Sequence, residues 1–457
     1  MLLFYLWLAS TPFLSISPWQ SIFHTSFYIG YLYLVLWVLA IAGCVFFNKN
    51  SLAEMKAVLS KNKAFYWLIS GFIIWNIISL VFNWHSIFAP SYMVEASGLK
   101  GPHYYNLFYL AYLLLNVAML YFIHLICRSR EKLISVVNFI FYASAAAALY
   151  GILTIWGYML GFVKTLVYPV YQLPRVYGTA IEPQSFGDYL IPIVLLAFYF
   201  IARKNARLFS YLSAIVVFLA FIMTFSTGAW VGAAVAILIY LGLAYRINGR
   251  EFYRRLGFII IPLLAVGFAL NLYLWPSYYK SFVGPLSKIQ VWKVGAELKV
   301  VKNKLASEET VFYDPLKVDI FDDKITRLWM AQTAMNMFNV HPILGIGPGS
   351  YGFLYNSYRP EGTPIKKFIE RTHNLYLQVL AENGMIGLIL FLGIIIVPIH
   401  KLFRKWKLFK EPEDRLLAIT LLAGFIGLLA HGLSYGVIQH SYFWVYLGLL
   451  MAVLEVL

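Results

Sequence analysis

The chain has 457 residues, of which 61% are hydrophobic and only 12% are charged, and its mean hydropathy is +0.73. These values exclude an ordinary soluble globular protein and are typical of a protein that crosses a membrane many times. The net charge of +16 does not indicate nucleic-acid binding, because the basic residues cluster beside apolar runs, where they set topology and attract anionic lipid headgroups. The cysteines, Cys44 and Cys127, offer neither a disulfide framework nor a Cys-based metal site.

Apolar runs long enough to cross a bilayer recur along the whole chain. They predict an all-α fold, a polytopic membrane bundle of about 12 transmembrane helices near residues 2–17, 26–47, 64–84, 104–127, 134–160, 185–201, 207–225, 229–245, 256–275, 376–400, 416–434 and 438–456. No basic segment precedes the first run, so we expect a retained span rather than a cleaved signal peptide.

Basic residues recur in alternate connections between these runs, at 49–63, 128–132, 203–207, 246–255 and 400–410. The positive-inside rule assigns these connections, and with them both termini, to the cytoplasm. We therefore expect one integrated membrane domain in three parts. Transmembrane helices 1–9 fill residues 1–275, a large extracytoplasmic (periplasmic) loop fills 276–372, and transmembrane helices 10–12 fill 373–457.

The large loop is too long to be a mere connector. The segment "GPLSKIQVWKVGAELKVVKNKL" (284–305) mixes apolar residues with lysines, which predicts either an amphipathic helix at the membrane surface or a solvated basic face. The segment "HPILGIGPGS" (341–350) is interpreted as a turn, because it lacks the strand and helix of a nucleotide-binding loop. A second amphipathic helix is predicted at 325–338, with a packing stripe formed by Leu328, Ala331, Met335 and Phe338.

The segment "RTHNLYLQVLAENGMIG" (371–387) joins the loop to the next apolar run. Within a helix, Asn374, Gln378 and Glu382 repeat every four residues and form one polar stripe. The stripe must line a cavity or face other helices, because exposing Glu382 to lipid would be costly. The helix N-terminus would favour an anion beside His373. This pattern predicts a site for a negatively charged substrate at the outer face, although His373 could instead be an interface residue and Glu382 a tie between helices.

Further charged residues fall on the same outer face. Arg175, Glu182 and Asp188 surround the start of the predicted span at 185–201, and Arg327 lies in the large loop. Arginine suits phosphate because its guanidinium is permanently charged and donates in a planar fork. The alternative is that these arginines only set topology or reach for the membrane surface. The acidic segment "DIFDDK" (319–324) has no partnering histidine and makes a weak metal site.

Four segments follow one another before, around and inside the large loop: "RVYGTAIEPQSFGDYL", "MTFSTGAWVG" (223–232), "RLWMAQTAMNMFNVHPILGIGPGSY" (327–351) and "HNLYLQVLAENGMIGLILF" (373–391). Together they resemble the O-antigen ligase and polysaccharide polymerase superfamily of bacterial inner-membrane glycosyltransferases. The resemblance implies transfer of a glycan from an undecaprenyl-diphosphate carrier to an acceptor hydroxyl at the outer face of that membrane. The acceptor would be lipid A core or a lipid-linked glycan, and neither metal, nucleotide sugar nor other cofactor would take part.

The resemblance also implies residue roles. His373 matches the family's proposed catalytic base, and Arg327 matches an arginine that contacts the diphosphate. The family commonly has arginine where this chain has Thr227, so Arg175 or Arg371 would have to replace that diphosphate contact. The supporting residues are then Asn374, Gln378, Glu382 and Glu182.

The residues suit the chemistry that the resemblance implies. Displacing a lipid diphosphate needs cations for the departing charge and a base near the incoming hydroxyl, and an unperturbed histidine, with a pKa of about 6.5, is such a base. We predict a metal-independent, inverting glycosyltransferase of O-antigen ligase type in lipopolysaccharide or surface polysaccharide biosynthesis, with a repeat-unit polymerase of the same superfamily as the alternative. A transporter or flippase of lipid-linked sugars is disfavoured, because the polar residues gather at the outer face and not at the midplane.

Overall fold

The computed structural model describes residues 60–86, 102–159, 175–180, 182–203, 206–245, 247, 257, 320–361, 363, 371–436 and 438–457. Every element in this part of the chain is helical. In chain order these elements are α5 (Lys63–Asn83), α7 (Pro102–Ile126), α8 (Arg130–Met159), α9 (Pro183–Ala202), α10 (Leu208–Met223), a helix at Thr227–Tyr245, α13 (Ile320–Val340), α14 (Tyr351–Tyr358), α15 (Leu375–Lys405), the 3-10 helix η2 (Trp406–Leu408), α16 (Pro412–His431) and α17 (Ser441–Val456).

Among the described residues, 7 helices are long and apolar enough to cross a membrane. They are α5, α7, α8, α9, the helix at Thr227–Tyr245, α15 and α16, while α10 and α17 are shorter apolar helices. All of these match predicted spans. The predicted spans near 2–17, 26–47 and 256–275 lie outside the described residues, as does the basic segment 284–305, so the count of about 12 spans stays a prediction.

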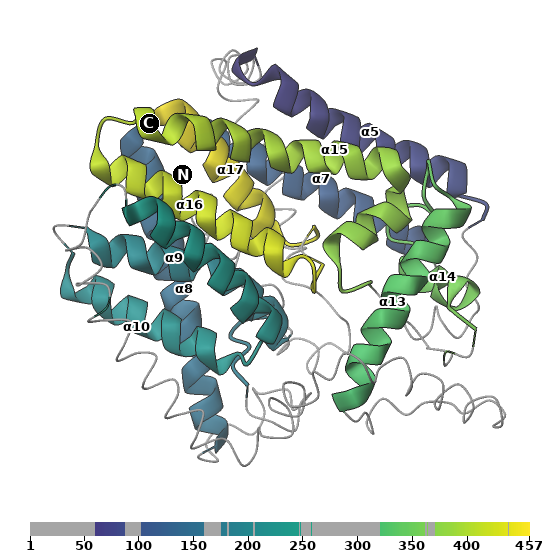
Figure 1. Cartoon of the computed structure of the whole chain (residues 1–457), viewed down its shortest axis with the longest axis horizontal. Helices are drawn as coiled ribbons and strands as arrows, with labels where there is room; N and C mark the ends of the chain where they lie inside the picture. The colour runs from purple at the N-terminus through teal and green to yellow at the C-terminus, as the bar shows by residue number, and fades with distance from the viewer. Residues whose placement is uncertain are drawn as a thin grey trace.

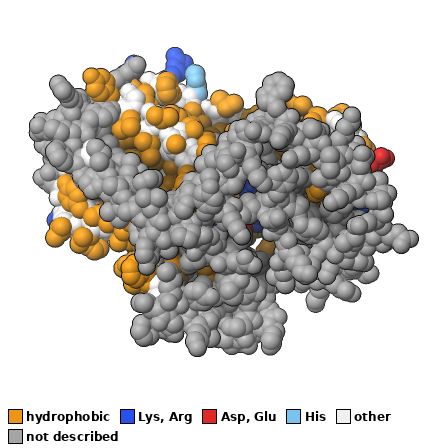
Figure 2. All heavy atoms as spheres, turned by 60° about the horizontal axis from the view of Figure 1, so that its bottom comes forward, with side chains coloured by type: hydrophobic (Ala, Val, Ile, Leu, Met, Phe, Trp, Pro, Cys, Tyr) orange, Lys and Arg blue, Asp and Glu red, His pale blue; other side chains and the backbone are white. Residues whose placement is uncertain are grey.

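The surface of these helices is apolar. Large side chains are exposed, among them Trp67 (73%), Phe82 (73%) and Leu238 (70%). On the face seen in Figure 2, most of the described side chains are hydrophobic and few are charged. A surface of this kind is unfavourable in water but suits lipid tails, as in a multi-pass membrane protein.

The helices form two neighbouring groups with α17 between them (Figure 1). In one group α9 packs against α10 and α16, and in the other α5 packs along α15. Helix α17 contacts α7, α15 and α16, and its side chains are buried along almost its whole length. The start of α9, the connection between α16 and α17, and the segment just before α15 contact one another.

Helix α15 is interrupted at Gly384, whose φ of 65° is left-handed. A Cβ atom at this position would lie only 2.1 Å from the carbonyl oxygen of Ile343. The turn after α13 lies against this interruption, because Met385 N donates to Pro342 O at 2.8 Å. The close approach that glycine permits here is thus to a loop backbone, not to another helix.

The segment 341–350 forms successive turns, as predicted, and Gly345, Gly347 and Gly349 all have positive φ. The predicted packing stripe of α13 is wrong. Leu328 and Met335, both in that stripe, are 40% and 38% exposed. The buried face instead includes Met330, Ala334 and Met337, which pack against α14 and Ala381 of α15. Apolar residues occur on both faces of α13, so periodicity alone did not identify the packed one.

Candidate active site

His373 lies immediately before α15 in a left-handed backbone conformation, with φ of 53°. Histidine adopts this conformation more readily than most residues other than glycine. Asn374 is the N-cap, and its Oδ1 accepts from the N–H groups of Tyr376 and Leu377, each at 3.0 Å. The Thr372 hydroxyl donates to Asn374 O at 2.6 Å and accepts from Asn374 N at 3.0 Å. Hydrogen bonds on both sides thus hold the backbone of His373.

These bonds correct one expectation about the helix N-terminus. Besides the two N–H groups capped by Asn374, Leu375 N donates to Gly432 O at 2.7 Å and Gln378 N donates to Asn374 O at 2.9 Å. The first N–H groups of α15 are therefore satisfied by the protein. The expectation that these N–H groups would bind an anion is therefore wrong. The side chain of Asn374, a residue type that is among the most effective N-caps, and the carbonyl of Gly432 already accept from them.

The polar stripe of α15 faces the protein interior, as predicted. Gln378 accepts from Thr372 N through Oε1 and donates through Nε2 to Glu382 Oε1, both at 2.7 Å. Glu382 is fully buried and also accepts from Tyr351 N at 3.3 Å. Its backbone carbonyl accepts from Gly347 N at 3.0 Å. The stripe therefore links the segment holding His373 to the turns at 341–350 and to the start of α14.

Tyr435, from the connection between α16 and α17, joins several of the predicted site residues. Its hydroxyl lies 2.5 Å from Glu182 Oε1, 2.5 Å from Ser185 Oγ and 3.5 Å from Arg371 Nη1. The guanidinium carbon of Arg371 lies 5.7 Å from the centre of the Tyr435 ring, and the His373 ring lies 6.1 Å from it. The structure thus brings Arg371, His373 and Glu182 together around one phenol.

A second polar group backs this arrangement. His431 Nδ1 lies 2.5 Å from Asp188 Oδ1, and the Tyr442 hydroxyl donates to the other Asp188 oxygen. His431, Tyr435, His440 and Tyr442 stack in sequence, with ring centres 5.4, 5.8 and 5.2 Å apart and planes within 10°. Burial, and secondarily the positive charge of Arg371, lowers the pKa of His440 to about 3, so this ring is neutral at neutral pH.

Arg175 braces the turn that precedes Thr227. Its Nε donates to Thr224 O at 2.8 Å and its Nη2 donates to Phe225 O at 2.9 Å. Phe225 has a positive φ of 48°, so the arginine stabilises a strained turn. Gly187 of α9 packs against the same turn. Arg175 therefore lies beside the position where the resemblance leads one to expect an arginine.

Arg327 is on α13, which packs against α14 and α15, and not on the elements that surround Tyr435. The side chains of "DIFDDK" lie outside the described residues. Within the part of the chain that the structure describes, no group of three or more His, Cys, Asp or Glu side chains could hold a metal ion.

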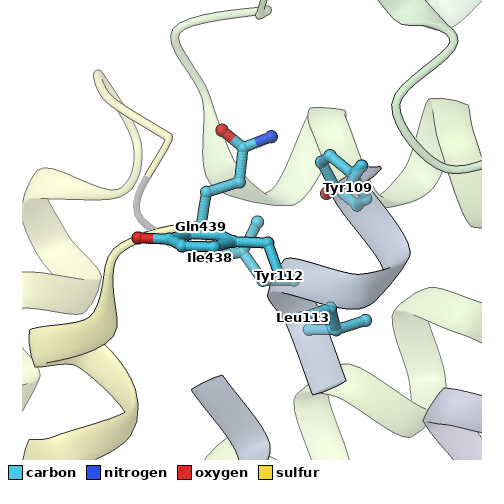
Figure 3. A pocket seen from close by; sticks show the side chains of 5 residues that line it. All are labelled: Tyr109, Tyr112, Leu113, Ile438 and Gln439. Carbon is cyan, nitrogen blue, oxygen red and sulfur yellow. The ribbon is translucent and has the colours of Figure 1, made fainter. Parts of the chain in front are cut away.

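A narrow depression lies beside the connection that carries Tyr435 (Figure 3). Tyr109, Tyr112 and Leu113 of α7 line it together with Ile438 and Gln439 of the connection. Its lining is largely apolar and bears no charge. None of these lining residues adds a cation or a base to the site.

Tyr435, His431 and His440 belong to the site but were not predicted from the sequence. The available signal was the segment "HGLSYGVIQH" (431–440), which carries two histidines and a tyrosine between two apolar runs. The predicted span at 416–434 extended over part of it and concealed its polar character. In the structure α16 ends at His431, which leaves the segment as a connection.

The arrangement has two chemical capacities. Arg371 offers a permanent positive charge suited to an anionic group, and the neighbouring His373 offers an imidazole ring, the side chain most often used as a general base. Glu182 and Asp188 are held by phenol and imidazole groups from α16, α17 and the connection between them. A site of this kind could bind a phosphorylated substrate and remove a proton next to it.

Part of the chain is similar to a known protein family. Residues 212–392 match the model of the family described as O-antigen ligase. The matched region contains Arg327, Arg371 and His373, whereas Arg175, Glu182 and Tyr435 lie outside it. A comparison with curated proteins gives no match.

Proposed function

We propose that this multi-pass membrane protein transfers a glycan from undecaprenyl diphosphate to an acceptor hydroxyl, because residues 212–392 match the model of the O-antigen ligase family. The transfer takes place at the outer face of the bacterial inner membrane, with both chain termini in the cytoplasm. The observation that carries the proposal is the convergence of Arg371 and His373 on Tyr435, at a helix start next to the large loop.

In the proposed reaction His373 accepts the proton of the acceptor hydroxyl. The acceptor oxygen attacks the anomeric carbon, a new glycosidic bond forms, and the bond from that carbon to the diphosphate oxygen breaks. The electron pair leaves with the lipid diphosphate, whose developing charge Arg371 stabilises. A single displacement inverts the anomeric configuration. Arg175 and Arg327 are proposed as further diphosphate contacts, and arginines take the place of a metal ion.

Within the superfamily, we favour a ligase over a polymerase because the matched family is described as an O-antigen ligase. The two activities differ in the acceptor. A ligase uses lipid A core or another anchor, and a polymerase uses a second lipid-linked repeat.

Purified protein in detergent, supplied with a glycan on undecaprenyl diphosphate, tests the proposal. We expect transfer to lipid A core, an unchanged rate in EDTA, and a product with inverted anomeric configuration. Elongation of the lipid-linked glycan without added lipid A core would identify a polymerase instead. The absence of any transfer, or a loss of activity in EDTA that magnesium restores, would contradict the proposed mechanism.

A further inference from the structure

Tyr435 lies outside the region that matches the family model, residues 212–392, and takes no part in the proposed reaction. Its side chain is only 1% exposed, yet its hydroxyl contacts residues from two other parts of the chain. Glu182 and Ser185 belong to the start of α9, and Arg371 precedes α15. One phenol oxygen therefore joins a carboxylate and a guanidinium that are far apart in sequence.

The donor and the acceptor of each of these two hydrogen bonds can be assigned. Tyr435 donates its proton to Glu182, since a carboxylate only accepts, and Arg371 donates to the phenol oxygen. Burial raises the pKa of Tyr435 well above its usual range, although the charge of Arg371 opposes this effect. The hydroxyl therefore keeps its proton over the working pH range and holds the same orientation throughout.

The ring of Tyr435 is fixed as firmly as its hydroxyl. It stacks between His431 and His440, at 5.4 and 5.8 Å. His431 is hydrogen-bonded to Asp188, and His440 stacks on Tyr442, which donates to the same Asp188. Both faces of the ring are thus backed by groups that one buried carboxylate holds in place, and the ring cannot move without disturbing them.

We infer that Tyr435 is a positioning residue, which sets the guanidinium of Arg371 and the ring of His373 at a fixed separation through its hydroxyl and its ring. The inference rests on the proposed function, in which Arg371 holds the diphosphate and His373 takes the proton. Glu182 acts through Tyr435 and completes the link. Reactions of this type are sensitive to displacements of about 1 Å, so a loss of this link should reduce the rate without removing a reacting group.

The test uses Tyr435→Phe, which keeps the stacked ring and removes only the hydroxyl. From the typical free energy of a hydrogen bond to a charged group, we predict that kcat/KM for transfer falls by roughly 10- to 100-fold. Tyr446→Phe in α17 is the matched control, because Tyr446 is also 1% exposed and its hydroxyl makes no hydrogen bond within the described residues. We expect the control to transfer at close to the native rate.

A double-mutant cycle distinguishes positioning from a general structural role. If Tyr435 acts through Arg371, then Tyr435→Phe should cause little further loss in an Arg371→Lys background. Losses that multiply, or a native rate in Tyr435→Phe, would overturn the inference. If Tyr435→Phe does not accumulate, Glu182→Gln enters the same cycle with the same expectation.

The same double-mutant cycle is also applied to the affinity for undecaprenyl diphosphate, because binding of this lipid requires no glycan transfer. Wild-type protein that binds this lipid but transfers nothing would contradict the proposed function alone, and the cycle on binding would still decide the role of Tyr435. Wild-type protein that does not bind the lipid would overturn both.

Discussion

At the scale of single residues, the site depends on where one arginine and one histidine are held. Arg371 reaches the hydroxyl of Tyr435 and lies over its ring, while His373 is fixed in a left-handed conformation by its neighbours. The two side chains are separated by a single residue in sequence, so their relative placement depends on the local backbone and on the phenol that both approach.

Arg371→Lys should weaken the use of the diphosphate donor by roughly tenfold or more, because lysine keeps the charge but loses the planar fork. The measurement is the KM for donor in purified protein. Arg203→Lys is the matched control, since Arg203 pairs with Glu413 at 3.2 Å in a region predicted to be cytoplasmic. An unchanged KM in Arg371→Lys would show that Arg371 is not a donor contact.

Stability should fall as the pH is lowered, in part because of His440. Its folded-state pKa is lowered to about 3, whereas the unfolded value is about 6.5. Its contribution is fully present above the unfolded pKa and is lost as the pH falls below it, since the unfolded chain then binds the proton. Thermal unfolding in detergent at several pH values should show that the melting temperature falls less with decreasing pH in His440→Asn than in the native protein. If the melting temperature depends on pH equally in His440→Asn and in the exposed control His85→Asn, His440 does not cause the loss of stability.

At the scale of elements, the break in α15 determines how the large loop packs on the membrane helices. Gly384 lets the turn after α13 approach the helix backbone, and Met385 N donates to that turn. Ser79 of α5 donates to Leu344 O at 2.6 Å and to Glu382 O at 3.1 Å. The loop is therefore held by α5 and α15 together.

Gly384→Ala should destabilise the protein by more than about 1 kcal/mol, because the new Cβ would meet the Ile343 carbonyl and the left-handed φ disfavours alanine. Gly242→Ala is the control, since a Cβ at Gly242 meets nothing within 4 Å and alanine is the better helix former. Thermal unfolding of both variants measures the difference. Equal melting temperatures would show that the break at Gly384 is not required for stability.

The sequence was enough to predict the features that depend on residues close together in the chain. Apolar runs predicted each described span, and the spacing of Gln378 and Glu382 predicted a buried stripe. The buried face of α13 and the role of Tyr435 depend on contacts between segments distant in sequence, which periodicity does not encode. Tyr435 in particular looks like an ordinary aromatic residue at a span end until α9 is placed beside it.

At the scale of the whole molecule, ion pairs and polar clusters are concentrated at the two ends of the helices. Arg130 lies 2.8 Å from Asp414, and Arg203 lies 3.2 Å from Glu413. These pairs join the start of α8, the end of α9 and the start of α16. Tyr435 and its partners lie at the other ends of α9 and α16. The positive-inside rule assigns the ends with these basic residues to the cytoplasm, which leaves the proposed site on the outer face.

This topology predicts opposite locations for two reporters. A fusion in the large loop near Ser307 should be extracytoplasmic, and one near Lys407 should be cytoplasmic, as judged by enzymes that are active on only one side of the membrane. Inverted membrane vesicles and protease protection provide an independent check. Both reporters on the same side would contradict the proposed arrangement.

The central claim is that His373 is the base in glycan transfer, and the rate of His373→Ala tests it most directly. A base that takes the proton in the transition state contributes a factor of roughly 10² to 10⁴. We predict a loss of that size in transfer from undecaprenyl diphosphate, with donor binding and membrane insertion retained, and a native rate in the control His400→Ala at the other end of α15. Transfer by His373→Ala at close to the native rate would contradict the account.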